Sequence, residues 1–160
     1  MDIIQTYHKE THGSISSPES MRLAWRTGLG IFGVFISYFF VMQVMGLQKH
    51  LLLRSVNFVF LMAGIVYSLK RYSRMRGGKI EYFKGLKLGM LVTAIATVPF
   101  AVFVGIWLSL DTSLMNYLQQ HYIEMGKYLY PTSAAIAVAM EGLSSGFIVT
   151  FVAMPYFKKQ

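Results

Sequence analysis

The chain has 160 residues and no cysteine; 54% of its residues are hydrophobic and only 14% are charged. Soluble domains carry about 25% charged residues, so this composition is typical of a membrane protein. The formal net charge of +8 does not indicate nucleic-acid binding, because the cations stand at the ends of apolar runs, where membrane topology requires them. The lack of cysteine excludes disulfides, thiolate catalysis and Cys-ligated metal centres.

Four apolar runs predict helices that cross a bilayer, although Arg54 and Asn57 leave the second run with a short uninterrupted apolar part. They cover residues 27–46, 51–69, 88–110 and 132–154. We therefore predict that residues 17–160 form one all-α domain, an integral membrane four-helix bundle. Residues 1–16 are polar and of mixed charge, and predict a flexible N-terminal tail.

Two patterns near the N-terminus resemble binding motifs. His8 and His12 could share one helix face as metal ligands, but Gly13 and several serines make this tail a poor helix, and solvated histidines are the favoured interpretation. Residues 28–33 match G-x-G-x-x-G, yet no strand precedes them, so close helix packing is favoured over nucleotide binding. Pro18, after a serine and before a glutamate, predicts the start of the first helix.

The basic linker 70–87 carries seven of the fifteen Lys and Arg residues. Gly77 and Gly78 predict a turn between two helix ends. The positive-inside rule then places the linker and both termini on the cytoplasmic side of the membrane. The cations expected to contact anionic lipid headgroups are Lys70, Arg71, Arg74, Arg76, Lys79, Lys84 and Lys87.

The outer connections leave two alternatives open. Arg54, near the start of the second span, is expected to snorkel to the outer interface, and an inward turn toward an acid is the alternative. The outer loop 111–131 has apolar residues at helical spacing, which predicts a short interfacial helix between the third and fourth spans. A substrate-gating lid is the alternative for the same residues.

Residues 58–103 carry a family resemblance. The segment Ser68-Leu-Lys-Arg-Tyr72 ends a span, the Gly77-Gly78 turn follows, and Ile80-Glu-Tyr-Phe-Lys84 leads into Gly85-Leu-Lys-Leu-Gly89-Met. This order resembles a family of small bacterial four-span membrane proteins described only as a domain of unknown function. The resemblance covers most of the chain from the first span onward. It implies a four-span fold and a location in the bacterial inner membrane, and it implies no activity, cofactor or catalytic residue.

The first and third spans also begin alike. Residues 25–29 and 86–90 share one pattern: an apolar residue, a cation, any residue, a glycine and an apolar residue. The two segments lie 61 positions apart. If this match is structural, two helical hairpins are related by a parallel repeat with its axis along the membrane normal.

Glu141 is the only Asp or Glu within the four predicted spans. A charged side chain at the centre of a spanning helix costs at least about 2.5 kcal/mol, so Glu141 is expected to be protonated and turned into the bundle. Pro99 leaves the carbonyl of Ile95 without its helical donor. Glu141, Thr93 or Thr97 is expected to supply the missing hydrogen bond.

The predicted spans contain no nucleophile with a base, no paired carboxylates and no metal-ligand set, so neither an enzyme nor a cofactor is expected. The sequence favours a non-catalytic accessory or assembly protein that packs as a homo-oligomer or within a larger membrane complex. The alternative function is a small proton- or ion-coupled transporter that uses Glu141 at mid-membrane.

Overall fold

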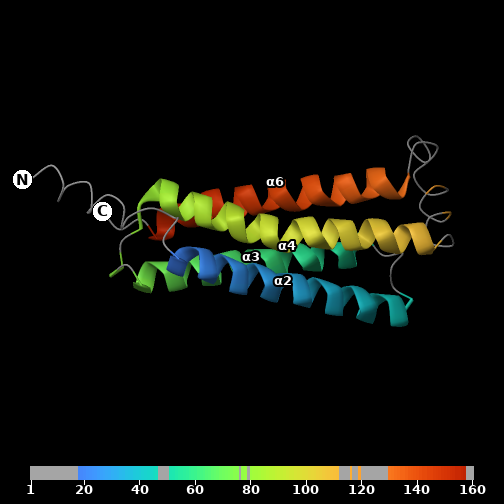
Figure 1. Ribbon diagram of the computed structural model, residues 1–160, viewed down its shortest axis with the longest axis horizontal. Helices are drawn as coiled ribbons and strands as arrows, with labels where there is room; N and C mark the ends of the chain where they lie inside the picture. The colour runs from blue at the N-terminus through green and yellow to red at the C-terminus, as the bar shows by residue number, and fades with distance from the viewer. Residues whose placement is uncertain are drawn as a thin grey trace, which may run out of the picture.

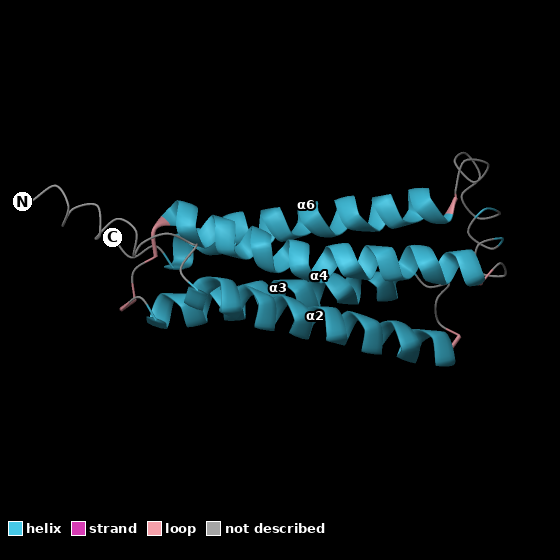
Figure 2. Ribbon diagram, viewed as in Figure 1, coloured by secondary structure: helices cyan, strands magenta, loops and turns pink. Residues whose placement is uncertain are grey.

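The computed structural model consists of four long helices that run alternately in opposite directions (Figure 1). It describes residues 18–46, 51–75, 77–78, 80–111, 116, 119 and 130–157, and only the backbone of residues 51–54. The helices are α2 (Pro18–Val44), α3 (Leu51–Met75), α4 (Tyr82–Leu110) and α6 (Pro131–Phe157). All regular secondary structure in these ranges is helical (Figure 2). The predicted all-α class is confirmed.

Three of the helices, α2, α4 and α6, are long and apolar enough to cross a membrane within the described ranges. They have 27, 29 and 27 residues, or about 40 Å of helix each at 1.5 Å per residue. The hydrocarbon layer is about 30 Å thick. The helix α3 has 25 residues and contains the second predicted span. It is not among the helices that are long and apolar enough to count as a membrane span.

The helix α3 ends at two glycines with left-handed backbone conformation, at the position where the sequence predicts a turn. Gly77 and Gly78 have φ values of 70° and 89°, which are costly for residues with a Cβ. The N–H of Gly78 donates to the carbonyl of Ser73 at 2.9 Å, and that of Gly77 donates to the carbonyl of Arg74 at 3.4 Å. These two hydrogen bonds form a Schellman motif, which supplies donors to carbonyls that have no partner within the helix.

Two other helix ends are also satisfied by local hydrogen bonds. Gly46, with φ 68°, follows α2 and donates its N–H to the carbonyl of Gln43 at 3.1 Å. At the start of α6, Ser133 Oγ accepts a hydrogen bond from the N–H of Tyr130 at 2.8 Å. Pro131 is the first helical residue there, a position where no N–H is needed.

The helices α3 and α4 each contact all three other helices, whereas α2 and α6 lie at opposite corners of the bundle. The most extensive contact is between the antiparallel helices α4 and α6. The helices α2 and α4 run in the same direction, and their aromatic rings meet in order: Phe35 with Phe100 at 5.1 Å and Phe39 with Phe103 at 5.4 Å between ring centroids.

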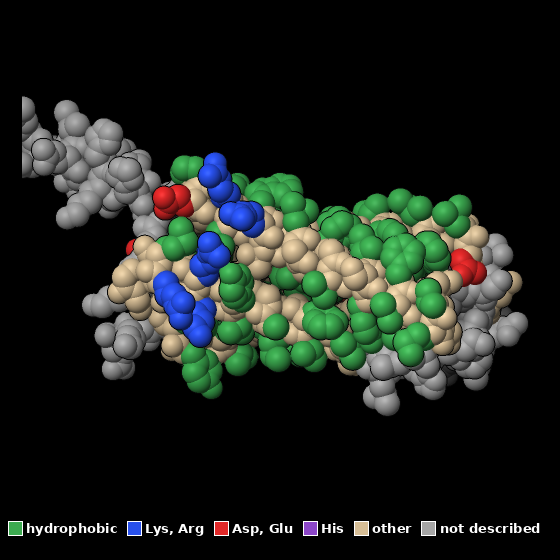
Figure 3. All heavy atoms as spheres, turned by 90° about the horizontal axis from the view of Figure 1, so that it is seen from below, with side chains coloured by type: hydrophobic (Ala, Val, Ile, Leu, Met, Phe, Trp, Pro, Cys, Tyr) green, Lys and Arg blue, Asp and Glu red, His purple; other side chains and the backbone are tan. Residues whose placement is uncertain are grey.

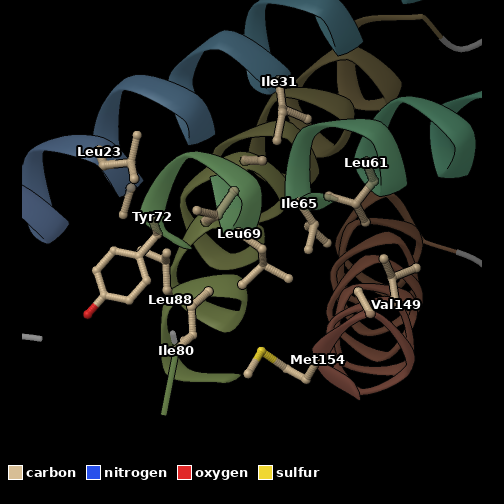
Figure 4. Packing of buried hydrophobic residues seen from close by; sticks show 14 of the residues in the cluster. Leu23, Ile31, Leu61, Ile65, Leu69, Tyr72, Ile80, Leu88, Val149 and Met154 are labelled. Carbon is tan, nitrogen blue, oxygen red and sulfur yellow. The ribbon is translucent and has the colours of Figure 1, made fainter. Parts of the chain in front are cut away.

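Side chains from all four helices form one buried cluster (Figure 4). The helix α3 supplies Leu61, Ile65 and Leu69 at four-residue spacing, which places them on one face. Leu88 of α4 and Met154 of α6 are fully buried against this cluster. Because lipid tails are as apolar as these side chains, close packing rather than transfer from water holds such helices together in a membrane.

The matched starts of the first and third spans do not pack equivalently. A Cβ on Gly28 would come within 2.6 Å of Ile95 on α4, whereas a Cβ on Gly89 would meet Thr150 on α6. A two-fold repeat would instead place Gly89 against α2. The glycine contacts therefore give no support to the repeat.

Several expectations concern residues outside those described. They are the tail with its two histidines, the side chains of Arg54, Arg76 and Lys79, and almost all of the predicted interfacial helix or lid at 111–131. These expectations remain predictions.

Candidate functional site

Small residues every four positions bring α4 and α6 into close contact. On α4 they are Gly85, Gly89, Thr93 and Thr97, and they face Met154, Thr150, Gly146 and Gly142 of α6 in antiparallel order. At each glycine of this set a Cβ would overlap the side chain opposite. We call these eight residues the Gly/Thr seam. Its backbones approach closely because each glycine makes room for a side chain of the other helix.

Two threonines of the seam satisfy their hydroxyl groups within their own helix. Thr93 Oγ1 donates to the carbonyl of Gly89 at 2.8 Å, and Thr150 Oγ1 donates to the carbonyl of Gly146 at 2.6 Å. Both bonds are buried. The same Gly-x-x-x-Thr arrangement thus occurs on both helices, and each threonine fills the space over the other helix's glycine. No water is needed to satisfy these two hydroxyls.

The hydrogen bonds near Pro99 differ from those predicted. Thr93 donates to Gly89, so the expectation that it would serve Ile95 is wrong. Thr97 Oγ1 is buried without any hydrogen-bond partner, so Thr97 does not serve Ile95 either. The helix α4 continues without a break through Pro99.

Glu141 lies close to the depth of Pro99, as predicted, but it points the other way. Its neighbour Gly142 packs against Thr97, two residues before Pro99. Gly142 is directed toward α4, whereas Glu141 is exposed on the bundle surface. The expectation that Glu141 turns into the bundle is therefore wrong. Residues one position apart on a helix are rotated by about 100°, and this rotation carries the carboxyl out of the α4 contact.

The outward position of Glu141 changes what the residue can do. Glu141 does not lie within the Gly/Thr seam, so its side chain takes no part in the close contact between α4 and α6. On the outer face the carboxyl is accessible to whatever surrounds the bundle. At mid-span that is lipid or another membrane protein, and a carboxylate in lipid costs about 2.5 kcal/mol or more.

The five predicted lipid-contact cations that the structure describes lie at one end of the bundle, opposite the end where α6 starts. Lys70, Arg71, Arg74 and Lys87 are exposed. Lys84 is only partly exposed and forms an ion pair with Glu81 at 2.6 Å between Nζ and Oε1. Figure 3 shows Lys and Arg side chains concentrated at this end of one face, with hydrophobic side chains along the rest of it.

Exposed aromatic residues accompany these cations. Trp25 and Tyr67 are about half exposed, and Phe83 and Tyr156 are more so. The guanidinium of Arg71 donates to the hydroxyl of Tyr67 at 3.0 Å. Aromatic and basic residues together are typical of the headgroup region of a membrane. Binding of anionic lipid headgroups at this end remains a prediction.

The sequence reasoning missed the α4 half of the Gly/Thr seam. The signal was present: Gly85, Gly89, Thr93, Thr97 and Ala101 recur at intervals of four, a small-residue pattern typical of membrane helix contacts.

No family model, curated protein or solved structure matches the chain. The resemblance of residues 58–103 to a family of small four-span proteins therefore stays a prediction. Within the described ranges, no group of three or more His, Cys, Asp or Glu side chains could hold a metal ion.

Proposed function

We propose that this chain is a four-span protein of the bacterial inner membrane that has no reaction chemistry of its own and works by packing laterally against other membrane proteins. The observation that carries the proposal is the exposure of Glu141 on the outer face of α6. A charged group at this depth is costly when it faces lipid, and a protein packed over this face of α6 would shield the carboxyl from lipid.

The proposal takes α3 as the fourth span. Its 25 residues correspond to about 37 Å of helix, long enough for the hydrocarbon layer. Its cations Lys70, Arg71 and Arg74 occupy the last turns, where they can reach the cytoplasmic headgroups. With four spans, the start of α2 and the end of α6 lie on the cytoplasmic side, as the positive-inside rule favours.

A transporter is less well supported than lateral packing. Intramembrane transport sites lie inside the bundle or in a water-filled cavity, whereas Glu141 faces away from the seam between α4 and α6. The basic end supports orientation and binding to anionic lipids, because each cation near such a surface contributes about 1 kcal/mol.

The test is the mass of the full chain in its membrane environment. The protein is extracted in a mild detergent, placed in lipid nanodiscs and weighed by native mass spectrometry. Lateral packing predicts a stable assembly, either with itself or with another membrane protein. A monomer that carries a proton flux in liposomes, with the flux lost in Glu141→Gln, would replace this function with transport.

A further inference from the structure

The first turns of α2 and α4 carry exposed cations at nearly the same depth. The two helices run in the same direction and contact each other. A Cβ on Gly28 of α2 would meet Val92 and Ile95 of α4. Arg22 stands six residues before Gly28, and Lys87 stands five before Val92 and eight before Ile95. The exposed side chains of Arg22 and Lys87 therefore leave neighbouring helices at one level.

On α2, Arg22 and Trp25 lie on the side that α3 does not cover. Gly28 faces α4, and Ile31 packs against Gly64 of α3. Trp25 stands three residues before Gly28 and Ile31 three residues after it, so the two lie about 60° to either side of the α4 contact. Arg22, three residues before Trp25, is its neighbour on the helix surface. Trp25 is 51% exposed.

On α4, Lys87 lies on the same open side of the helix pair. Gly85 and Gly89 face α6, and Lys87 is two residues from each, which is about 160° to 200° around the helix. Leu88 is fully buried in the hydrophobic cluster, and Lys87 is rotated away from it by about 100°. Lys87, Arg22 and Trp25 therefore border the outer surface between α2 and α4. We call these three residues the α2/α4 patch.

The α2/α4 patch stands where polar surface gives way to apolar surface. The predicted spans of α2 and α4 begin at residues 27 and 88. Leu29, one turn beyond Trp25, is 50% exposed and belongs to the apolar surface. Tryptophan is enriched at the headgroup level of a membrane, where its ring is apolar and its N–H is polar. The patch is therefore at the depth of phospholipid headgroups.

The charges of the patch suit a phosphate group. Lys84 forms an ion pair with Glu81, whereas no ion pair within the described part of the chain involves Arg22 or Lys87. A guanidinium donates two parallel hydrogen bonds to phosphate oxygens, and an ammonium adds a compact charge. Basic sites between membrane helices on the cytoplasmic side bind the phosphates of lipid headgroups.

We propose that the α2/α4 patch binds one anionic phospholipid, with its phosphate held between Arg22 and Lys87 and its glycerol region against Trp25. This inference rests on the anionic-lipid binding in the proposed function and assigns it a site. Two of the three residues, Arg22 and Trp25, lie outside the basic linker that directed attention to this end of the bundle.

Tryptophan fluorescence tests the site in liposomes. The chain has two tryptophans, Trp25 in the patch and Trp107 near the opposite end of α4. In Trp107→Phe, phosphatidylglycerol brominated on its acyl chains is expected to bind beside Trp25, and quench it, about tenfold more strongly than brominated phosphatidylcholine. Trp25→Phe, in which Trp107 reports, is the matched control and is expected to show no preference. Equal quenching of Trp25 by both lipids would overturn the proposal.

Charge substitutions in the Trp107→Phe background test the two cations. Arg22→Gln and Lys87→Gln are each expected to lower the preference for phosphatidylglycerol about fivefold. Lys70→Gln removes the same charge from an exposed position on α3 and is expected to lower it less than about twofold. A loss in Lys70→Gln as large as in Arg22→Gln would overturn the site, because general surface charge would then explain the preference.

The lipid measurement is independent of lateral packing. Native mass spectrometry of the natural chain, which keeps both tryptophans, counts the phosphatidylglycerol molecules retained by each assembly. A monomer that retains the lipid and shows the preference at Trp25 would leave the site standing and refute lateral packing. An assembly without that preference would leave lateral packing standing and refute the site.

Discussion

Gly89 of α4 and Thr150 of α6 pack so closely that a Cβ on residue 89 would overlap the threonine side chain. Gly146 and Thr93 make the same contact with the roles of the helices exchanged. The two contacts interlock α4 and α6 in both directions. Shape therefore holds this helix pair, and the outer face of α6 is left available for a partner.

The first prediction concerns the fit at residue 89. Gly89→Ala places a Cβ 2.9 Å from the Cβ of Thr150 and closer to its outer atoms. Overpacking of this kind costs about 1 to 3 kcal/mol. We expect a lower midpoint for SDS-induced unfolding in mixed micelles, followed by circular dichroism.

Gly30→Ala is the control for this substitution. Gly30 is exposed, and a Cβ there meets nothing within 4 Å. Its unfolding midpoint should stay unchanged or rise, since alanine favours helix. Adding Thr150→Ala to Gly89→Ala should recover part of the loss, because it removes the two overlapping outer atoms. Equal midpoints for Gly89→Ala and Gly30→Ala would contradict the seam.

The helices of this protein could be predicted from sequence because runs of apolar residues and their glycine and proline boundaries act locally. The turn at Gly77 is an example: its left-handed conformation follows from the residue itself. The direction of Glu141 could not be predicted in this way. It depends on which side of α6 meets α4, and that is decided by the match between glycines on one helix and threonines on the other. The fit between two helices distant in sequence is not visible in either one alone.

The second prediction compares two threonines of the seam. Thr97 Oγ1 is buried without a hydrogen bond, whereas Thr93 Oγ1 donates to Gly89. Thr97→Val replaces an unsatisfied hydroxyl with a methyl group of similar shape and should leave stability equal or raise it by up to about 1 kcal/mol. Thr93→Val should lower stability by about 0.5 to 1.5 kcal/mol. The same SDS titration measures both, and a loss in Thr97→Val as large as in Thr93→Val would show that Thr97 has a partner.

The third prediction concerns the turn after α3. Gly77 has a φ of 70°, and a residue with a Cβ pays about 1 to 2 kcal/mol in this region. Gly77→Ala should therefore lower the unfolding midpoint. Gly77→Asn should lower it less, because asparagine tolerates the left-handed conformation. If both variants unfold like the natural protein, the Schellman end is not a stabilising feature of α3.

The fourth prediction is the topology, including α3 as a span. Met75 at the end of α3 and Tyr130 before α6 are 50% and 60% exposed, and the chain has no natural cysteine. In intact bacterial cells a membrane-impermeant maleimide should label Tyr130→Cys and should reach Met75→Cys only after permeabilisation. The reason is the positive-inside rule, which keeps the basic end of α3 in the cytoplasm. Labelling of Met75→Cys in intact cells would mean that α3 does not cross the membrane in the expected direction.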